Sequence, residues 1–157
     1  MPKALKVKCF ILFFAVFIVI GRGDVRFEYL DCGSYFEINS VTVSNCTATP
    51  CVFSPGQNFT VQILITEVAQ FDRTELTTKA FLWMFGSSWP LEITPLNPCT
   101  SQWHCPVLQE NNLTYTADVH LLDNVIKRPA HVEVLITYDQ NGEMFQALCV
   151  EFAVNLE

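Results

Sequence analysis

Hydrophobic and polar residues alternate with a period of two in three segments of the chain, residues 58–66, 113–121 and 131–138. The apolar side chains of the first segment are Phe59, Val61, Ile63 and Ile65. β-Branched and aromatic residues are frequent in all three segments. Such alternation is typical of β-strands with one buried face, because successive side chains of a strand point to opposite faces.

Other features of the pattern also favour β-structure. Residues 80–85 are apolar throughout, which predicts a strand covered on both faces. Asn141-Gly142 lies between two strand-like runs and predicts a hairpin turn, and the Ser87-Ser-Trp-Pro90 cluster predicts another turn. No amphipathic helical stretch competes with this interpretation. The chain is therefore predicted to form one all-β domain, an immunoglobulin-like antiparallel β-sandwich of about seven or eight strands.

The N-terminus has a different pattern. Three lysines within the first eight residues precede an apolar run at residues 9–20, and two glycines follow it. A basic start, a short apolar run and small residues predict a secretory signal peptide, here residues 1–23 with cleavage after Gly23. The apolar run is too short to cross a bilayer core of about 30 Å as a helix. We expect residues 24–157 to form the folded domain and the protein to be secreted, into extracellular fluid or a lysosome-like compartment.

Composition and charge exclude some classes of protein. The chain of 157 residues is 50% hydrophobic, which is too much for a disordered chain. After cleavage, five basic residues would remain against sixteen acidic ones, a formal charge of −11. An acidic balance argues against nucleic acid as a partner, because phosphates are bound by basic side chains.

Cysteines are the most informative residue type. Loss of Cys9 with the signal peptide would leave six, and an even number predicts three disulfides in a secreted chain. These six are Cys32, Cys46, Cys51, Cys99, Cys105 and Cys149. Their spacing does not choose among the fifteen possible connectivities, although two pairs are close enough to form short local loops. A zinc site is disfavoured, since neither short spacing is C-x-x-C and the three histidines form no paired-ligand motif, so we expect no metal and no cofactor.

Three sequons of the form N-x-[ST] predict glycosylation at Asn45, Asn58 and Asn112. Asn45 is the least favoured of the three, because its neighbour Cys46 is expected in a tight disulfide.

Patterns that would indicate catalysis are missing from the sequence. The carboxylates are scattered, the serines lack a nucleophile-elbow pattern, and the glycines form no phosphate loop. Each histidine is most simply a strand or loop residue. We therefore expect no enzymatic activity.

The sequence around the cysteines resembles the ML-domain lipid-recognition family. The motifs are Asp31-Cys-Gly-Ser34, Val41-Thr-Val-Ser-Asn-Cys-Thr-Ala-Thr-Pro-Cys51, Pro98-Cys99, Cys105-Pro106 and a last cysteine near the C-terminus. The resemblance covers essentially all of residues 24–157. It implies the disulfides Cys32–Cys149, Cys46–Cys51 and Cys99–Cys105, and it implies two sheets that separate to hold a lipid in a cavity between them.

The resemblance also implies which residues contact the lipid. The corresponding positions are Phe59, Val61, Ile63, Leu91, Ile93, Val125, Pro129, Val134, Ile136 and Tyr138. The alternative is that these residues are ordinary core, since apolar strand faces are usually packed.

The chain departs from the sterol-carrying members of the family at the pocket mouth. Leu91 stands where those members have a phenylalanine, and Arg128 stands before Pro129 where they have a tyrosine. A guanidinium offers a planar fork to a carboxylate, so Arg128 is a candidate for binding an acidic lipid, although a solvated loop charge is a simpler interpretation. The hypothesis is a carrier of a fatty acid or similar apolar acid, with a sterol as the second choice.

A second hypothesis is an adaptor that presents lipid to a membrane receptor. Such a protein should expose an apolar patch, to which Phe145 or Phe152 could contribute, although both could equally belong to a core strand. We expect a monomer whose partners are a small hydrophobic ligand and, for delivery, a membrane receptor or a lipid-accepting protein.

Overall fold

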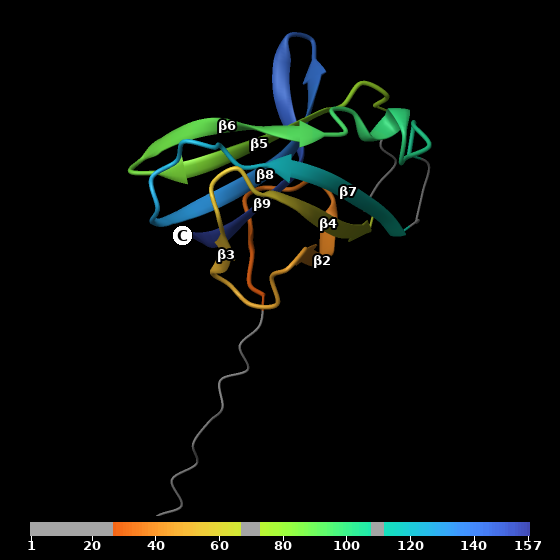
Figure 1. Cartoon of the computed structure of the whole chain (residues 1–157). Helices are drawn as coiled ribbons and strands as arrows, with labels where there is room; N and C mark the ends of the chain where they lie inside the picture. The colour runs from red at the N-terminus through yellow and green to blue at the C-terminus, as the bar shows by residue number, and fades with distance from the viewer. Residues whose placement is uncertain (1–26, 67–72, 108–111) are drawn as a thin grey trace, which may run out of the picture.

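The computed structural model of the chain describes residues 27–66, 73–107 and 112–157 (Figure 1). The predicted signal peptide, residues 1–23, lies outside the described residues. Across these three ranges there are nine strands and one short 3-10 helix, and no helix long and apolar enough to cross a bilayer. The elements are β1 (Leu30–Asp31), β2 (Glu37–Val43), β3 (Cys51–Phe53), β4 (Asn58–Thr66), β5 (Thr77–Met84), β6 (Ser87–Thr94), η1 (Pro98–Thr100), β7 (Asn112–His120), β8 (Pro129–Gln140) and β9 (Glu143–Leu156).

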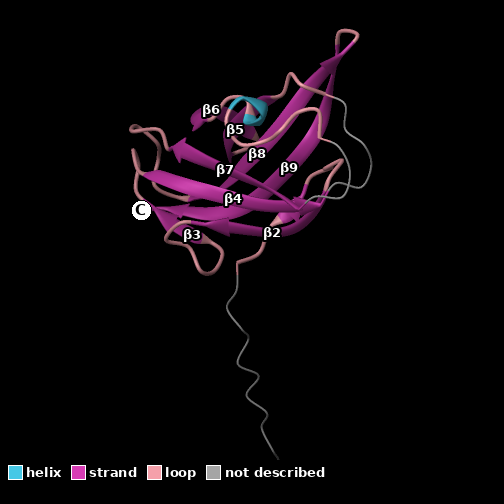
Figure 2. Cartoon of the chain, turned by 90° about the vertical axis from the view of Figure 1, so that its right-hand side faces the viewer, coloured by secondary structure: helices cyan, strands magenta, loops and turns pink. Residues whose placement is uncertain are grey.

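The strands form two layers that share β6 (Figures 1 and 2). Neighbouring strands follow the order β1-β9-β8-β5-β6-β7-β4-β2, and β3 pairs with β9 off this path. The first part of β6 pairs with β5, and its last three residues, Glu92 to Thr94, pair with β7. Because β6 crosses from one layer to the other, the sandwich is closed on this side, while β2 forms an edge. The predicted all-β antiparallel sandwich is confirmed, except that β3 and β9 run parallel.

Alternation of inward apolar and outward polar side chains along the strands produces the hydrophobic core. Phe59, Val61 and Ile63 of β4 point inward and are 0–2% exposed. Phe59 stacks on Phe53 of β3 with ring centroids 4.6 Å apart. Burial of each such side chain contributes about 1.5–3 kcal/mol, so the packed faces of the two layers stabilise the sandwich.

Two local predictions were wrong. Residues 80–85 are not a strand covered on both faces, since β5 alternates and the outward Trp83 is 37% exposed. The turn predicted at residues 87–90 lies instead at Phe85-Gly86, where φ is +53° and +73°, and β6 starts directly after it. The turn at Asn141-Gly142 is confirmed, with φ of +58° and +86° between β8 and β9.

The disulfides Cys32–Cys149, Cys46–Cys51 and Cys99–Cys105 are present, as the family resemblance implied. The D-C-G-S motif holds the first of them against β9. Asp31 Oδ1 accepts hydrogen bonds from the amides of Gly33 and Ser34, and the Ser34 hydroxyl bonds to the backbone of Cys149. Partial burial of Asp31 disfavours ionisation, but these hydrogen bonds outweigh it and hold the pKa of the carboxyl below its ordinary value.

Two carboxylates oppose each other on the outer face of the β8–β9 pair. Glu133 and Glu151 are direct cross-strand partners, and Glu151 also contacts Nδ1 of His131. Partial burial and then the charge of Glu151 raise the pKa of Glu133, with a hydrogen bond from Trp83 opposing them. The folded state therefore favours the protonated form of Glu133. As the pH rises through the raised pKa, the carboxyl ionises and its charge destabilises the folded state.

Replacement of Glu133 by Gln is expected to stabilise the protein at pH 7.5. The gain should be up to about 0.5 kcal/mol, because water screens the repulsion between partly exposed groups. The gain should shrink as the pH falls towards the ordinary glutamate value of 4.5, where the wild-type carboxyl becomes protonated. Urea midpoints at several pH values measure this, with Glu143→Gln on the exposed hairpin as the control; a gain independent of pH would contradict it.

Candidate functional site

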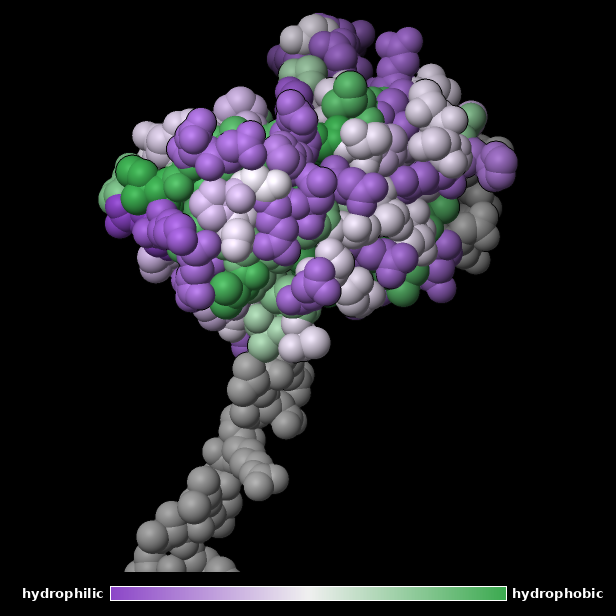
Figure 3. All heavy atoms as spheres, in the orientation of Figure 1, coloured by the Kyte–Doolittle hydropathy of each residue, from purple (hydrophilic) through white to green (hydrophobic). Residues whose placement is uncertain are grey.

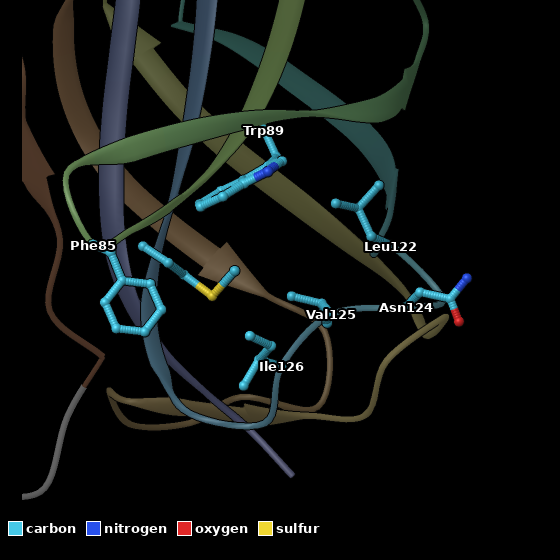
Figure 4. A pocket seen from close by; sticks show the side chains of 7 residues that line it. Phe85, Trp89, Leu122, Asn124, Val125 and Ile126 are labelled. Carbon is cyan, nitrogen blue, oxygen red and sulfur yellow. The ribbon is translucent and has the colours of Figure 1, made fainter.

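A pocket of about 200 Å³ opens at one end of the sandwich, between the β5–β6 turn and the loop that joins β7 to β8 (Figure 4). Its lining residues are Met84, Phe85, Trp89, Leu122, Asn124, Val125 and Ile126. Only Asn124 among them is polar. Phe85 and Ile126 at the rim are 67% and 66% exposed, and Figure 3 shows hydrophobic atoms on this end of the molecule. The mouth of the pocket is therefore apolar both inside and at its edge.

The backbone fixes both walls of this mouth. The tight turn at Phe85-Gly86 carries Phe85 to the rim while Met84 points inward, 8% exposed. The opposite loop is held by a hydrogen bond from the amide of Gly56 to the carbonyl of Leu122. Gly56 has a φ of +75°, a backbone conformation that favours glycine.

Arg128 brings a positive charge to the rim. Its guanidinium carbon lies 3.3 Å from the centroid of the Phe85 ring, the geometry of a cation–π contact. No ion pair among the described residues includes Arg128. Its charge is therefore not neutralised by a carboxylate in the described part of the protein.

Most of the predicted lipid contacts lie together between the two layers. Phe59, Val61 and Ile63 of β4 in one layer and Val134 and Ile136 of β8 in the other belong to one hydrophobic core cluster, and all five are 0–2% exposed. Leu91 and Ile93 of β6 are buried at the side where the layers join, with exposures of 7% and 6%. These residues thus form one continuous apolar interior.

Three other residues predicted to contact the lipid lie at the ends of this apolar interior or outside it. Val125 lines the mouth pocket, and Pro129 is exposed at the start of β8. Tyr138 lies on the hairpin that projects from the sandwich (Figure 1), where its ring stacks on Phe145 with centroids 5.6 Å apart. Arg73 lies over the Tyr138 ring at 5.4 Å. Tyr138 is thus separated from the residues of the mouth.

A second, more open pocket of about 470 Å³ lies where β5 and β6 diverge. The two strands pair up to Ala80 and Leu91, after which β6 turns away to join β7. The pocket is lined mainly by apolar residues, including Leu91 and Ile93. Thr78 of β5 also lines it. The buried interior therefore borders this pocket along its side as well as the pocket at the end of the sandwich.

The sequence prediction missed most residues of the mouth. Of its lining only Val125 was predicted. The apolar pairs Leu121-Leu122 and Val125-Ile126, close to the end of a strand, were a usable signal for an apolar loop. Phe85-Gly86 was another, since glycine after an aromatic residue at the end of a strand permits a tight turn.

Other candidate chemistry in the described part of the chain is structural. Sγ of Cys32, Sγ of Cys149 and a carboxylate oxygen of Glu133 lie within 4.8 Å of one another, but the two sulfur atoms are bonded to each other and cannot ligate a cation. Nδ1 of His120 lies 2.7 Å from Oδ1 of the sequon residue Asn58.

The three sequon residues Asn45, Asn58 and Asn112 are all exposed. Glycosylation at these positions stays a prediction.

Comparison with known proteins gives consistent results. The chain is 23% identical over 151 residues to NPC intracellular cholesterol transporter 2 of Canis lupus familiaris, which covers 93% of this chain and 98% of that protein. The protein of the same name from Bos taurus is 25% identical over 147 residues, with coverage of 93% and 94%.

The fold is similar to the crystal structure of a Niemann-Pick type C2 protein from Japanese carpenter ant. The TM-score is 0.66 at 16% identity, over 83% of this chain and 100% of that one. A family model described as ML domain matches residues 26–156, which include every described strand. The chain belongs to the ML-domain family.

Proposed function

We propose that this protein is a secreted lipid carrier, not an enzyme, which holds an apolar acid such as a fatty acid between its two sheets. The observation that carries the proposal is the apolar mouth, which leads to an apolar interior and has the unpaired charge of Arg128 at its rim. Membership of the ML-domain family and the likeness to proteins named cholesterol transporters support a lipid as cargo.

A lipid chain gains free energy by entering this interior. Removal of apolar surface from water is worth about 25 cal/mol per Å², so a long acyl chain has a large driving force for burial. The interior between the two pockets is filled by side chains that are almost fully buried. Binding therefore requires the two layers to separate, and β2 at the open edge allows this more readily than β6, which joins the layers on the other side.

The mouth favours an acid over an alcohol. A carboxylate at the rim would pair with the Arg128 guanidinium, and a charge-assisted hydrogen bond is about twice as strong as a neutral one. A sterol, which is neutral, is the second candidate cargo, since its hydroxyl could also reach the rim.

Replacement of Val125 by Trp is expected to weaken lipid binding about tenfold, because the indole would occupy a mouth of about 200 Å³. Titration of the purified protein with a fluorescent polyene fatty acid measures the affinity. Val52→Trp is the matched control, since Val52 is 53% exposed on β3 and lines neither pocket. Equal affinity of both variants and the wild type would overturn the proposed mouth, and failure of the wild type to bind any lipid would overturn the carrier.

The adaptor hypothesis retains one supporting observation. The β8–β9 hairpin projects from the sandwich (Figure 1), and Met144 and Phe145 on it are 55% and 39% exposed. Phe152, the other residue considered for such a patch, is 2% exposed and packs against Phe27 and Phe59. Presentation of lipid to a membrane receptor through this hairpin is the second candidate function.

A further inference from the structure

Two neighbouring hydroxyl groups lie inside the sandwich, and neither makes a well-formed hydrogen bond to any described residue. They are Oγ1 of Thr78 and the phenol oxygen of Tyr115, on side chains that are 2% and 0% exposed. Another buried threonine, Thr137, donates to the carbonyl of Thr77. Buried hydroxyls are nearly always fully hydrogen-bonded, so a pair with unused hydrogen-bonding capacity indicates a role outside the unliganded fold.

Both side chains belong to the inner surface of the sandwich. Thr78 alternates on β5 with Ala80, Leu82 and Met84, which all face inward. Tyr115 occupies the inward face of β7 in the opposite layer. Burial raises the pKa of Tyr115 to about 12, and a side-chain hydrogen-bond interaction with Thr78 opposes this rise, so the phenol stays protonated. The two hydroxyls are therefore neighbours, and a bond between them would use one donor and leave the other free for a ligand.

The two hydroxyls lie far from the mouth. The inner face of β5 runs from Met84, which lines the mouth, to Thr78, which lines the side pocket. Six residues of strand span about 20 Å, close to the length of an extended long-chain acyl group. A lipid with its head group at Arg128 and its chain along β5 would therefore bring its far end to Thr78 and Tyr115.

We propose that Thr78 and Tyr115 bind a second oxygen function at the far end of the lipid chain. The preferred cargo is then a long-chain acid with a hydroxyl or keto group near its other end. This inference rests on the proposed function and specifies its ligand. A plain acyl end would leave the remaining hydrogen-bonding capacity of this pair unused, and sites with buried polar groups discriminate strongly against ligands that cannot pair with them.

Calorimetric titration with ω-hydroxyhexadecanoic acid and with hexadecanoic acid tests the proposal. The wild type should bind the hydroxy acid about tenfold more tightly. Thr78→Val and Tyr115→Phe remove the hydroxyls with little change of shape, and each should bring the ratio of the two affinities close to one. Thr137→Val is the matched control and should keep the wild-type ratio, since its hydroxyl already bonds to the backbone.

The outcomes separate this proposal from the carrier function. Equal affinity of the wild type for the two acids, or a preference that survives both substitutions, would overturn the polar subsite and leave the carrier intact. Binding of neither acid would overturn both. Melting temperatures give an independent readout: hydroxyls with unused hydrogen-bonding capacity predict little loss of stability in the two variants, whereas a clear loss in both would mean that the hydroxyls are fully satisfied in the unliganded fold, which would overturn the proposal.

Discussion

Replacing both Cys32 and Cys149 by Ser is expected to lower the free energy of unfolding by about 5 kcal/mol. The two residues are 117 positions apart, so their bridge closes almost the whole described chain into one loop. In the chain-entropy model, a cross-link stabilises mainly by restricting the unfolded chain, and the effect grows with loop length. A loss of this size is a large part of the stability of an ordinary domain.

The matched control is the double serine variant of Cys46 and Cys51, whose separation is only 5 residues. The same model gives about 2 kcal/mol for this short loop. Urea denaturation of the three proteins measures both values. Equal losses would contradict the entropic account and would indicate that local packing around the bridges determines their contribution.

Reversal of the charge at Arg128 is expected to lower the affinity for a fatty acid about a hundredfold. In Arg128→Glu, an attractive contact with the carboxylate becomes a like-charge repulsion at the apolar rim, where water screens charges less than at an open surface. The affinity for the fatty alcohol of the same length should change by no more than about twofold, because it carries no charge. The Phe85 contact is lost in both titrations, so it cancels in the comparison.

Lys127→Glu is the control for net charge. It makes the same change of charge one residue away, on an exposed side chain that does not line the mouth. Its effect on acid binding should be small, since exposed charges are screened by salt. Equal losses for acid and alcohol in Arg128→Glu would mean that Arg128 only shapes the loop, and the preference for an acidic lipid would have to be abandoned.

The strands could be predicted where apolar and polar residues alternate along the chain. The pattern of residues 58–66 gives the bounds of β4, because a strand with one buried face leaves this signature without help from the rest of the fold. The sequence led to a wrong prediction at residues 87–90, where serine and proline indicated a turn. The chain turns two residues earlier, at Phe85-Gly86, and β6 runs through the predicted turn because it pairs with β5.

The site was less predictable than the strands. Alternation shows that Val61 and Val134 face inward, but it cannot show which inward residues lie at the mouth. Loop residues such as Asn124 and Ile126 have no periodicity to reveal them. Tyr115 looks like any inward aromatic residue in the sequence, and its unpaired hydroxyl becomes evident only when the opposite layer is in place.

Extraction of the lipid that co-purifies with the protein tests the central claim most directly. The chain should be expressed with its N-terminal segment through a eukaryotic secretory route, purified from the medium and analysed by mass spectrometry. We predict close to one apolar acid per protein molecule in the wild type and much less in Val125→Trp. A protein that carries no lipid and binds none when lipid is added would show that the inward strand faces are ordinary packed core, and the carrier account would be wrong.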